Sequence, residues 1–278
     1  MRRFALFAVS AIFVLSLAAY AEQSAVSGSG SIPAPSTASA QSAPAPMTAE
    51  QVAELRADIM MARKEFAAAI DAYLAILKDN PRDAMLLNKT GVAYQELGAY
   101  DSAAKYYKKS ERANKKLTNP VNNLGTLEYG LHHYSKSVNY YKRALKLGAS
   151  EATVYSNLGY AYYSEKKFEL AMDAFNKAVA IDPTVFDSHG GSGGTIMQQR
   201  TAPDPGTLNF FLAKSYARAG DAERAAHFLK LARDYGYKDL MSVSKDKDFA
   251  TVIKDPRIQD VLHNRPSFTD VDSKPTAN

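Results

Sequence analysis

The sequence contains no cysteine. The protein can therefore be neither a disulfide scaffold nor a lipoprotein attached through a cysteine, and thiol catalysis and cysteine-ligated metal are excluded as well. Its 34 Lys and Arg residues nearly balance its 29 Asp and Glu residues. Folding must rest on packing, and the global charge does not by itself identify a partner.

Signatures of catalysis and of metal binding are also missing. No histidine has a second histidine three or four residues away with a carboxylate to complete a metal site. The run Lys245 to Asp248 lacks the glycine and the distal glutamate of a calcium loop. No serine lies in a nucleophile-elbow context, and helical spacing forces no catalytic carboxylate pair together. The sequence predicts no enzyme, no metal and no cofactor.

The N-terminus has the pattern of an export signal. Arg2 and Arg3 precede an apolar run that ends in the small-x-small site Ala19-Tyr20-Ala21. This run is shorter than the ~20 residues that a membrane span needs. We expect a signal peptide at residues 1–21 and a location in the periplasm or outside the cell. Residues 22–47 consist almost entirely of Ala, Ser, Pro, Gly and Gln, which predicts a disordered linker.

From Thr48 onward the apolar residues take helical spacing and repeat every 34 residues. Ala57, Gly91, Gly125 and Gly159 keep this register. Other columns keep step, namely Tyr100, Tyr134 and Phe168; Ala69, Ala103 and Ala171; and Tyr73, Tyr107, Tyr141 and Phe175. A small residue on one helix opposite an aromatic on the next allows close approach of the two helices, so these columns are predicted core.

This register, together with helix-ending prolines such as Pro81 and Pro183, resembles the tetratricopeptide repeat family. The resemblance implies an all-α, right-handed superhelical solenoid of antiparallel helix pairs. It implies four repeats at residues 48–183 and a fifth at 207–237, where the register resumes 20 residues late. Residues 238–263, with a helix that begins at Pro256, are expected to cap the array, and 264–278 to be a disordered tail.

The late register marks an insertion at residues 184–206. It holds a glycine-rich turn between Thr184-Val185-Phe186 and Thr195-Ile196-Met197, a pattern compatible with a short hairpin. A phosphate-binding loop is a second reading, but no Lys-Ser/Thr follows the glycines. A hydrolase site in this insertion remains a remote alternative function.

The resemblance also implies a concave groove lined by the first helix of each pair. Carrying the family's groove positions onto this chain gives predicted partner-binding residues Asn88, Lys89, Gln95, Asn122, Asn123, Tyr129, Asn157, Tyr160, Tyr163, Lys214 and Arg218. An amide-rich and tyrosine-rich lining suits an extended peptide, with Tyr129, Tyr160 and Tyr163 as anchors. Asn123 and Asn157 are equally explained as common residues of the repeat pattern.

A basic stripe offers another surface. Residues 101–150 have a local net charge of +7, and Lys105, Lys108, Arg112 and Lys115 recur at helical spacing on a second helix. A solvated helix face explains this pattern, and an anionic envelope polymer or membrane surface is the alternative. Export argues against nucleic acid. The sequence thus predicts an exported scaffold that binds a protein or peptide, and it leaves the oligomeric state open.

Overall fold

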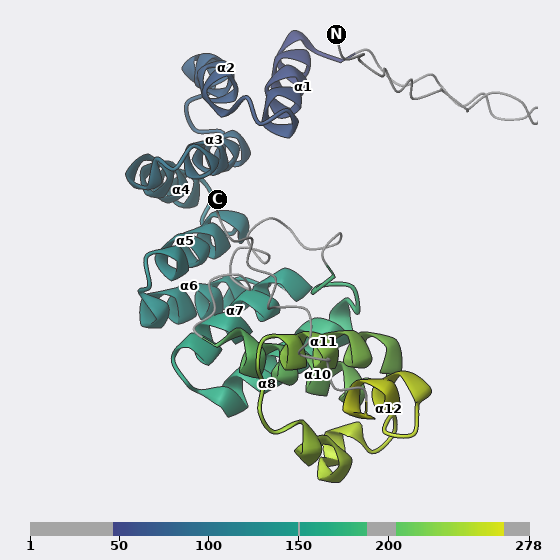
Figure 1. Ribbon diagram of the computed structural model, residues 1–278. Helices are drawn as coiled ribbons and strands as arrows, with labels where there is room; N and C mark the ends of the chain where they lie inside the picture. Colours follow the sequence, from purple (N-terminus) through teal and green to yellow (C-terminus); the bar gives the residue numbers. More distant parts are fainter. Residues whose placement is uncertain (1–46, 150, 188–203, 264–278) are drawn as a thin grey trace, which may run out of the picture. The chain divides into compact units, whose positions relative to one another are not determined.

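The computed structural model describes residues 47–149, 151–187 and 204–263, and these residues form helices and turns without any strand (Figure 1). The α-helices are α1 Ala49–Ala62, α2 Phe66–Asp79, α3 Ala84–Glu96, α4 Tyr100–Ala113, α5 Asn119–Gly130, α6 Tyr134–Lys146, α7 Ala152–Ser164, α8 Phe168–Ile181, α10 Pro205–Arg218, α11 Ala222–Asp234 and α12 Pro256–His263. Two 3₁₀-helices, η1 Leu240–Lys245 and η2 Lys247–Phe249, precede α12. None of these helices is long and apolar enough to cross a membrane.

Local signals fix the helix ends. Thr48 and Gln51 form a capping box at the start of α1, and the carboxylates of Asp83, Asp204 and Asp221 accept hydrogen bonds from the first turns of α3, α10 and α11. Each cap satisfies a backbone N–H that has no partner within its helix.

The turn inside each pair places one residue in the left-handed region of backbone space. Gly98 has φ of 80°. Glycine adopts this conformation without strain because it has no Cβ. The equivalent residue of the α10–α11 pair is Gly220, with φ of 79°, and those of the other three pairs are Lys64, His132 and Lys166, with φ of 61°, 60° and 60°. The turn geometry is therefore kept even where its residue is unfavourable for that backbone conformation.

Within a pair, the two helices approach at the small-residue column. A Cβ added at Gly91, Gly125 or Gly159 would lie 2.6, 2.6 and 2.4 Å from the ring opposite. The opposing rings, Tyr107, Tyr141 and Phe175, are fully buried. The sequence-based pairing of glycine with aromatic is thus observed as direct contact, and the all-α solenoid of helix pairs is confirmed.

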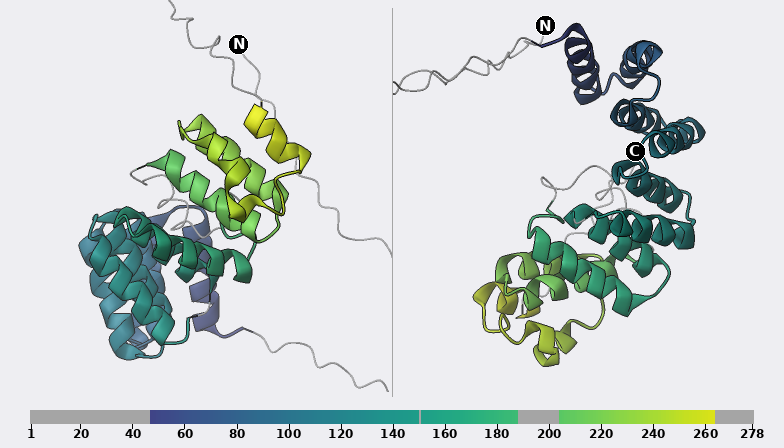
Figure 2. Two further views of the ribbon diagram at one scale, coloured as in Figure 1. Left: turned by 90° about the horizontal axis from the view of Figure 1, so that it is seen from below. Right: turned by 180° about the vertical axis from the view of Figure 1, so that it is seen from behind.

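Neighbouring pairs stack in chain order, and α12 lies beside α11 (Figure 2). The segment after Tyr237 covers the last pair. Val243, Phe249 and Ile258 are fully buried in the same apolar cluster as α10 and α11, and the Thr251 hydroxyl donates to the carbonyl of Ala217. An apolar face that would otherwise end the array is covered in this way.

The segment before the insertion differs from expectation. Thr184–Phe186 is a turn rather than a strand, and Val185 and Phe186 are buried in the core. Proline at the first turn of a helix is favourable, and α10 accordingly begins at Pro205, inside the range assigned to the insertion. The second arm of the expected hairpin, like the expected signal peptide, linker and C-terminal tail, lies outside the described residues.

Candidate partner-binding face

The first helices α3, α5 and α7 are joined by a line of asparagine amides, here called the amide ladder. The Asn123 amide nitrogen donates to Asn88 Oδ1 at 3.0 Å, and the Asn157 amide nitrogen donates to Asn122 Oδ1 at 3.3 Å. Asn122 also donates to Asn123 at 3.5 Å. The structure therefore brings together four of the predicted site residues across three consecutive repeats.

The members of the ladder differ in exposure. Asn122 and Asn123 are half-buried, whereas Asn157 is buried and its Oδ1 has no hydrogen-bond partner among the described residues. The oxygens of Asn209 and Tyr160 are likewise buried without a partner in the described part of the chain. A partner on the surface cannot reach these enclosed atoms, so the half-buried Asn122 and Asn123 are the accessible side chains of the ladder.

At one end of the face, Lys89 is held by the first pair. Its Nζ lies 2.7 Å from Glu54 Oε1 and 2.6 Å from Asp58 Oδ2, and the Tyr73 hydroxyl donates to Asp58 at 2.6 Å. Burial alone would lower the pKa of Lys89, but hydrogen bonds to Asp58 and Glu54 outweigh it and raise the pKa. Lys89 thus links two repeats and has no free charge to offer a partner.

At the other end, Lys214 is held by the cap. Its Nζ lies 2.8 Å from Asp246 and 3.2 Å from Asp248, and it sits over the Phe210 ring, which stacks on Tyr237. Burial opposes the charge on Lys214, yet the two carboxylates raise its pKa. A structural role explains this lysine.

Two other predicted site residues, Gln95 and Arg218, take no part in the hydrogen bonds of the amide ladder. Arg218 is exposed at the end of α10, and Gln95 accepts a hydrogen bond from the Tyr107 hydroxyl at 3.0 Å. Gln95 is therefore occupied in positioning the ring that opposes Gly91. Among the predicted basic residues, Arg218 is the one whose side chain is exposed to solvent.

The three tyrosine anchors require a correction. Tyr129, Tyr160 and Tyr163 are 3%, 0% and 4% exposed, so their rings are core rather than exposed lining. The hydroxyls of Tyr129 and Ser164 lie 3.0 Å apart, and the Tyr163 hydroxyl donates to the carbonyl of Asp204. Burial raises the pKa of Tyr160 well above its usual value. The three rings are buried by close packing between neighbouring helix pairs, which the repeat pattern of a single sequence does not predict.

An accessible aromatic pair lies next to this face instead. Phe168, at the start of α8, is 41% exposed and stacks on the half-buried Phe211 of α10, with ring centroids 5.4 Å apart. Phe211 follows Asn157 in the repeat register once the 20-residue offset is counted. The sequence reasoning assigned Phe168 to the core column. Its counterparts in the same column, Tyr100 and Tyr134, are 47% exposed and half-buried, so the prediction that this column belongs to the core is wrong.

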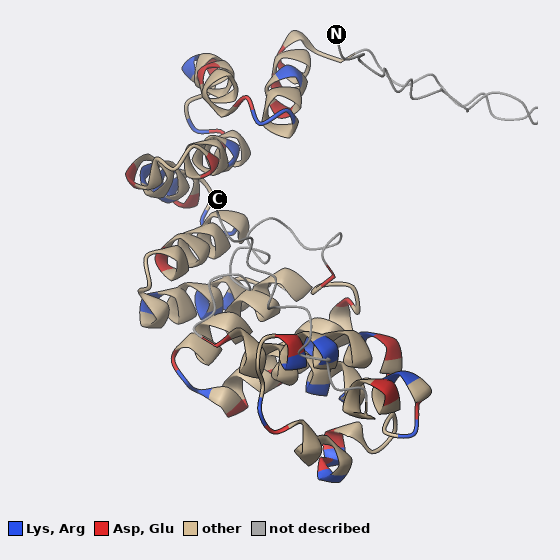
Figure 3. Ribbon diagram, in the orientation of Figure 1, with Lys and Arg blue, Asp and Glu red and all other residues tan. Residues whose placement is uncertain are grey.

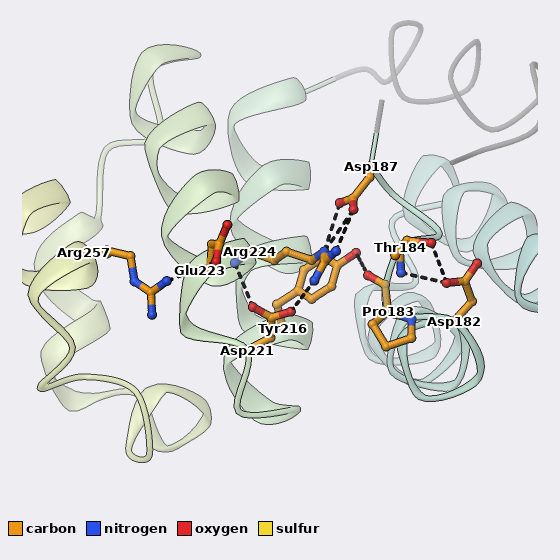
Figure 4. Close-up of polar contacts among 9 residues, drawn as sticks. All are labelled: Asp182, Pro183, Thr184, Asp187, Tyr216, Asp221, Glu223, Arg224 and Arg257. Atoms are coloured by element: carbon orange, nitrogen blue, oxygen red, sulfur yellow. Dashed lines mark hydrogen bonds and ion pairs between the residues drawn. The ribbon is translucent and has the colours of Figure 1, made fainter. Parts of the chain in front are cut away.

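A clamp fixes the chain before the insertion (Figure 4). The Arg224 guanidinium donates to both carboxylate oxygens of Asp187, at 2.8 to 3.1 Å, and to Asp221 at 2.8 Å. The Tyr216 hydroxyl donates to the carbonyl of Pro183 at 2.8 Å. A bidentate arginine–carboxylate pair has a defined orientation, so this clamp sets where the segment after α8 leaves the array.

Comparison with protein families decides the identity of the repeats. Tetratricopeptide repeat models match residues 55–116 and 152–185. These repeats belong to the tetratricopeptide repeat family. In this repeat protein the two matched ranges contain α2 to α4 and α7 to α8, and the unmatched α5 and α6 keep the same register and the same contact of glycine with tyrosine. No curated protein sequence matches the chain.

Among solved structures, the fold is similar to that of PilF from Pseudomonas aeruginosa. The two sequences are 16% identical, the TM-score is 0.50, and the match covers 77% of this repeat protein and 86% of PilF. A thermophilic tetratricopeptide repeat protein of Thermus thermophilus has 18% identity and a TM-score of 0.47, covering 74% and 99%. MamA from Desulfovibrio magneticus has 17% identity and a TM-score of 0.47, covering 67% and 94%. At these identities the likeness concerns the fold alone.

Proposed function

We propose that this repeat protein is an exported scaffold, without catalytic activity, that binds an extended polypeptide segment of a partner along α3, α5 and α7. The amide ladder is the observation that carries the proposal. Asn122 and Asn123 are half-buried, and an asparagine amide offers both a donor and an acceptor to a partner's main chain.

The spacing of the ladder suits an extended chain. Packed helices lie about 8 to 10 Å apart, and a strand advances about 3.3 Å per residue. A peptide crossing the ladder therefore meets one repeat at about every third residue. Phe211 follows Asn157 in the register, and the exposed Phe168 that stacks on it supplies an apolar contact for one side chain of the peptide.

Two features support a binding role over catalysis. Lys89 and Lys214 are neutralised by carboxylates of neighbouring elements rather than left as reactive amines. The hydrogen-bonding groups along the first helices are amides, which recognise polar backbone and do not transfer protons at neutral pH.

A linear random peptide library displayed on phage tests this proposal, with residues 47–278 as bait. These residues form a compact unit separate from the first 46. Selected peptides should bind Asn123→Ala and Phe168→Ala about five- to tenfold more weakly, because each change removes one contact worth about 1 kcal/mol or more. Asn139→Ala is the matched control, since Asn139 is an exposed amide on the second helix α6. Equal loss in the control, or no selected peptide, contradicts the proposal.

Export is the other part of the proposal. It is supported by the basic and apolar N-terminal pattern that ends at Ala21. N-terminal sequencing of the protein recovered from the native cell envelope or medium should begin at Glu22. An unprocessed chain confined to the cytosol contradicts this part and leaves the peptide-binding proposal untouched.

A further inference from the structure

Positive charge gathers on the second helices of two consecutive repeats. Blue segments mark Lys and Arg on both α4 and α6 in Figure 3. The residues are Lys105, Lys108, Lys109, Arg112, Lys115, Lys116, Lys142, Arg143 and Lys146, here called the basic face, and all are exposed. Lys115 and Lys116 lie in the turn after α4, which ends at Ala113, and not on the helix as the sequence pattern predicted for Lys115. The acidic residues between Tyr100 and Lys116 are Asp101 and Glu111, and α6 contains none.

The basic face repeats with the register of the array. Lys108 and Lys142, Lys109 and Arg143, and Arg112 and Lys146 are each 34 residues apart. Each of these helices also carries a half-buried tyrosine under a cation, with Lys109 Nζ 4.7 Å from the Tyr106 ring centroid and Arg143 4.9 Å from that of Tyr140. The same positions of α2 and α8 hold alanine in place of the tyrosine.

The two halves of the basic face are contiguous. Arg143 forms an ion pair with Glu111 at 3.0 Å, which joins α6 to α4, and Tyr140 packs against the cluster that contains Ala103 and Tyr107 of α4. No carboxylate of the described residues lies within ion-pair distance of Lys108, Lys142 or Lys146. Apart from Arg143, no residue of the basic face has an ion pair within the described part of the chain, so most of this charge is uncompensated.

From this face we infer that the protein attaches to anionic lipid surfaces through α4 and α6. Most of the basic residues are lysines, whose ammonium groups are strongly hydrated and stay in water at a charged surface. Lysine is depleted from the cores of protein–protein interfaces, which must be desolvated. The charges spread in two dimensions, matching a headgroup layer better than a single extended acidic chain. Tyrosines at such a boundary keep their rings apolar and their hydroxyls wet.

This attachment is independent of the peptide-binding proposal. The amide ladder lies on first helices and the basic face on second helices. Attachment through α4 and α6 leaves α3, α5 and α7 available to a polypeptide. The protein then holds its partner at a membrane surface without inserting a helix.

Vesicle co-sedimentation tests the inference, with residues 47–278 and vesicles of phosphatidylcholine alone or mixed with phosphatidylglycerol. Binding should require phosphatidylglycerol and weaken strongly between about 0.1 and 1 M salt, over which the Debye length shortens from about 10 to 3 Å. The variant Lys108→Gln/Lys142→Gln/Lys146→Gln should bind on the order of 100-fold more weakly, because each basic residue near an anionic surface contributes about a fivefold factor.

The matched control is Lys230→Gln/Lys238→Gln/Lys254→Gln, which removes the same charge from exposed positions outside the basic face. It should bind within about threefold of the unaltered protein, since charges far from the contact are screened. Equal loss in both variants overturns the site, and equal binding to phosphatidylcholine overturns the electrostatic mechanism. Binding to polyglutamate or duplex DNA, lost in the first variant and not in the control, with no binding to phosphatidylglycerol, overturns the lipid assignment.

Discussion

Gly125→Ala tests the close approach of helices within a pair. The added Cβ would lie 2.6 Å from Tyr141 Cε1, where ordinary contacts begin at 3.4 Å. Tyr141 is fully buried and its hydroxyl donates to Thr126 Oγ1 at 3.2 Å, so the ring cannot swing aside without losing that bond. Helices α5 and α6 must therefore move apart.

The magnitude follows from two opposing effects. Alanine gains about 1 kcal/mol over glycine inside a helix, while overpacking a core costs about 1 to 3 kcal/mol. The first pair has Ala57 in this column opposite Tyr73, so a pair can adjust its spacing. We expect a net loss of about 1 kcal/mol, or about 2 to 4 °C in Tm for a unit of this size.

The assay is urea and thermal unfolding followed by circular dichroism. Gly130→Ala is the control in the same helix, because a Cβ there meets nothing within 4 Å, and it should be neutral or stabilising. Combining Gly125→Ala with Tyr141→Leu recreates the pairing of Ala213 with Leu229 in the last pair, and the double variant should lose less than the two single changes added together. If Gly125→Ala is as stable as Gly130→Ala, the packing argument is wrong.

Four further outcomes are expected. Lys166→Gly should stabilise the protein by about 0.5 to 1 kcal/mol, measured as a higher urea midpoint, because Lys166 has φ of 60°. Asp187→Asn should cost about 1 kcal/mol or less, since its bidentate pair with Arg224 is partly exposed, and hydrogen exchange should rise at residues 184–187. Burial opposes the charge on Asp221, but hydrogen bonds from Arg224 lower its pKa; urea midpoints should therefore be constant above about pH 4 and fall below it, less steeply in Asp221→Asn. Truncation after Tyr237 should lower Tm and promote association by light scattering, because Val243, Phe249 and Ile258 no longer cover the last pair; an unchanged monomer contradicts the capping role.

The sequence predicted the repeats well because their determinants are local and periodic. The glycine column that contains Gly125 and the aromatic column that contains Tyr141 both recur every 34 residues. Their contact follows from the pairing of successive helices. The start of α12 at Pro256 rests on a capping signal that is local as well. Boundaries near the insertion were less accurate, because the turn at Thr184–Phe186 is set by burial of Val185 and Phe186 against later helices.

The candidate site was harder to predict for the same physical reason. The register placed Asn122 and Asn123 on the first helices, and the amide ladder joins them to Asn88 and Asn157. Exposure depends on how neighbouring pairs stack, which no single repeat encodes. Tyr160 is consequently buried, although its position in the repeat predicted an exposed anchor.

Hydrogen exchange on residues 47–278, with and without a library-selected peptide, tests peptide binding along the first helices most directly. Bound peptide should slow exchange in α3, α5 and α7 and leave α4 and α6 unchanged, because the amide ladder belongs to the first helices. Protection confined to α4 and α6, or spread evenly over all helices, contradicts the account.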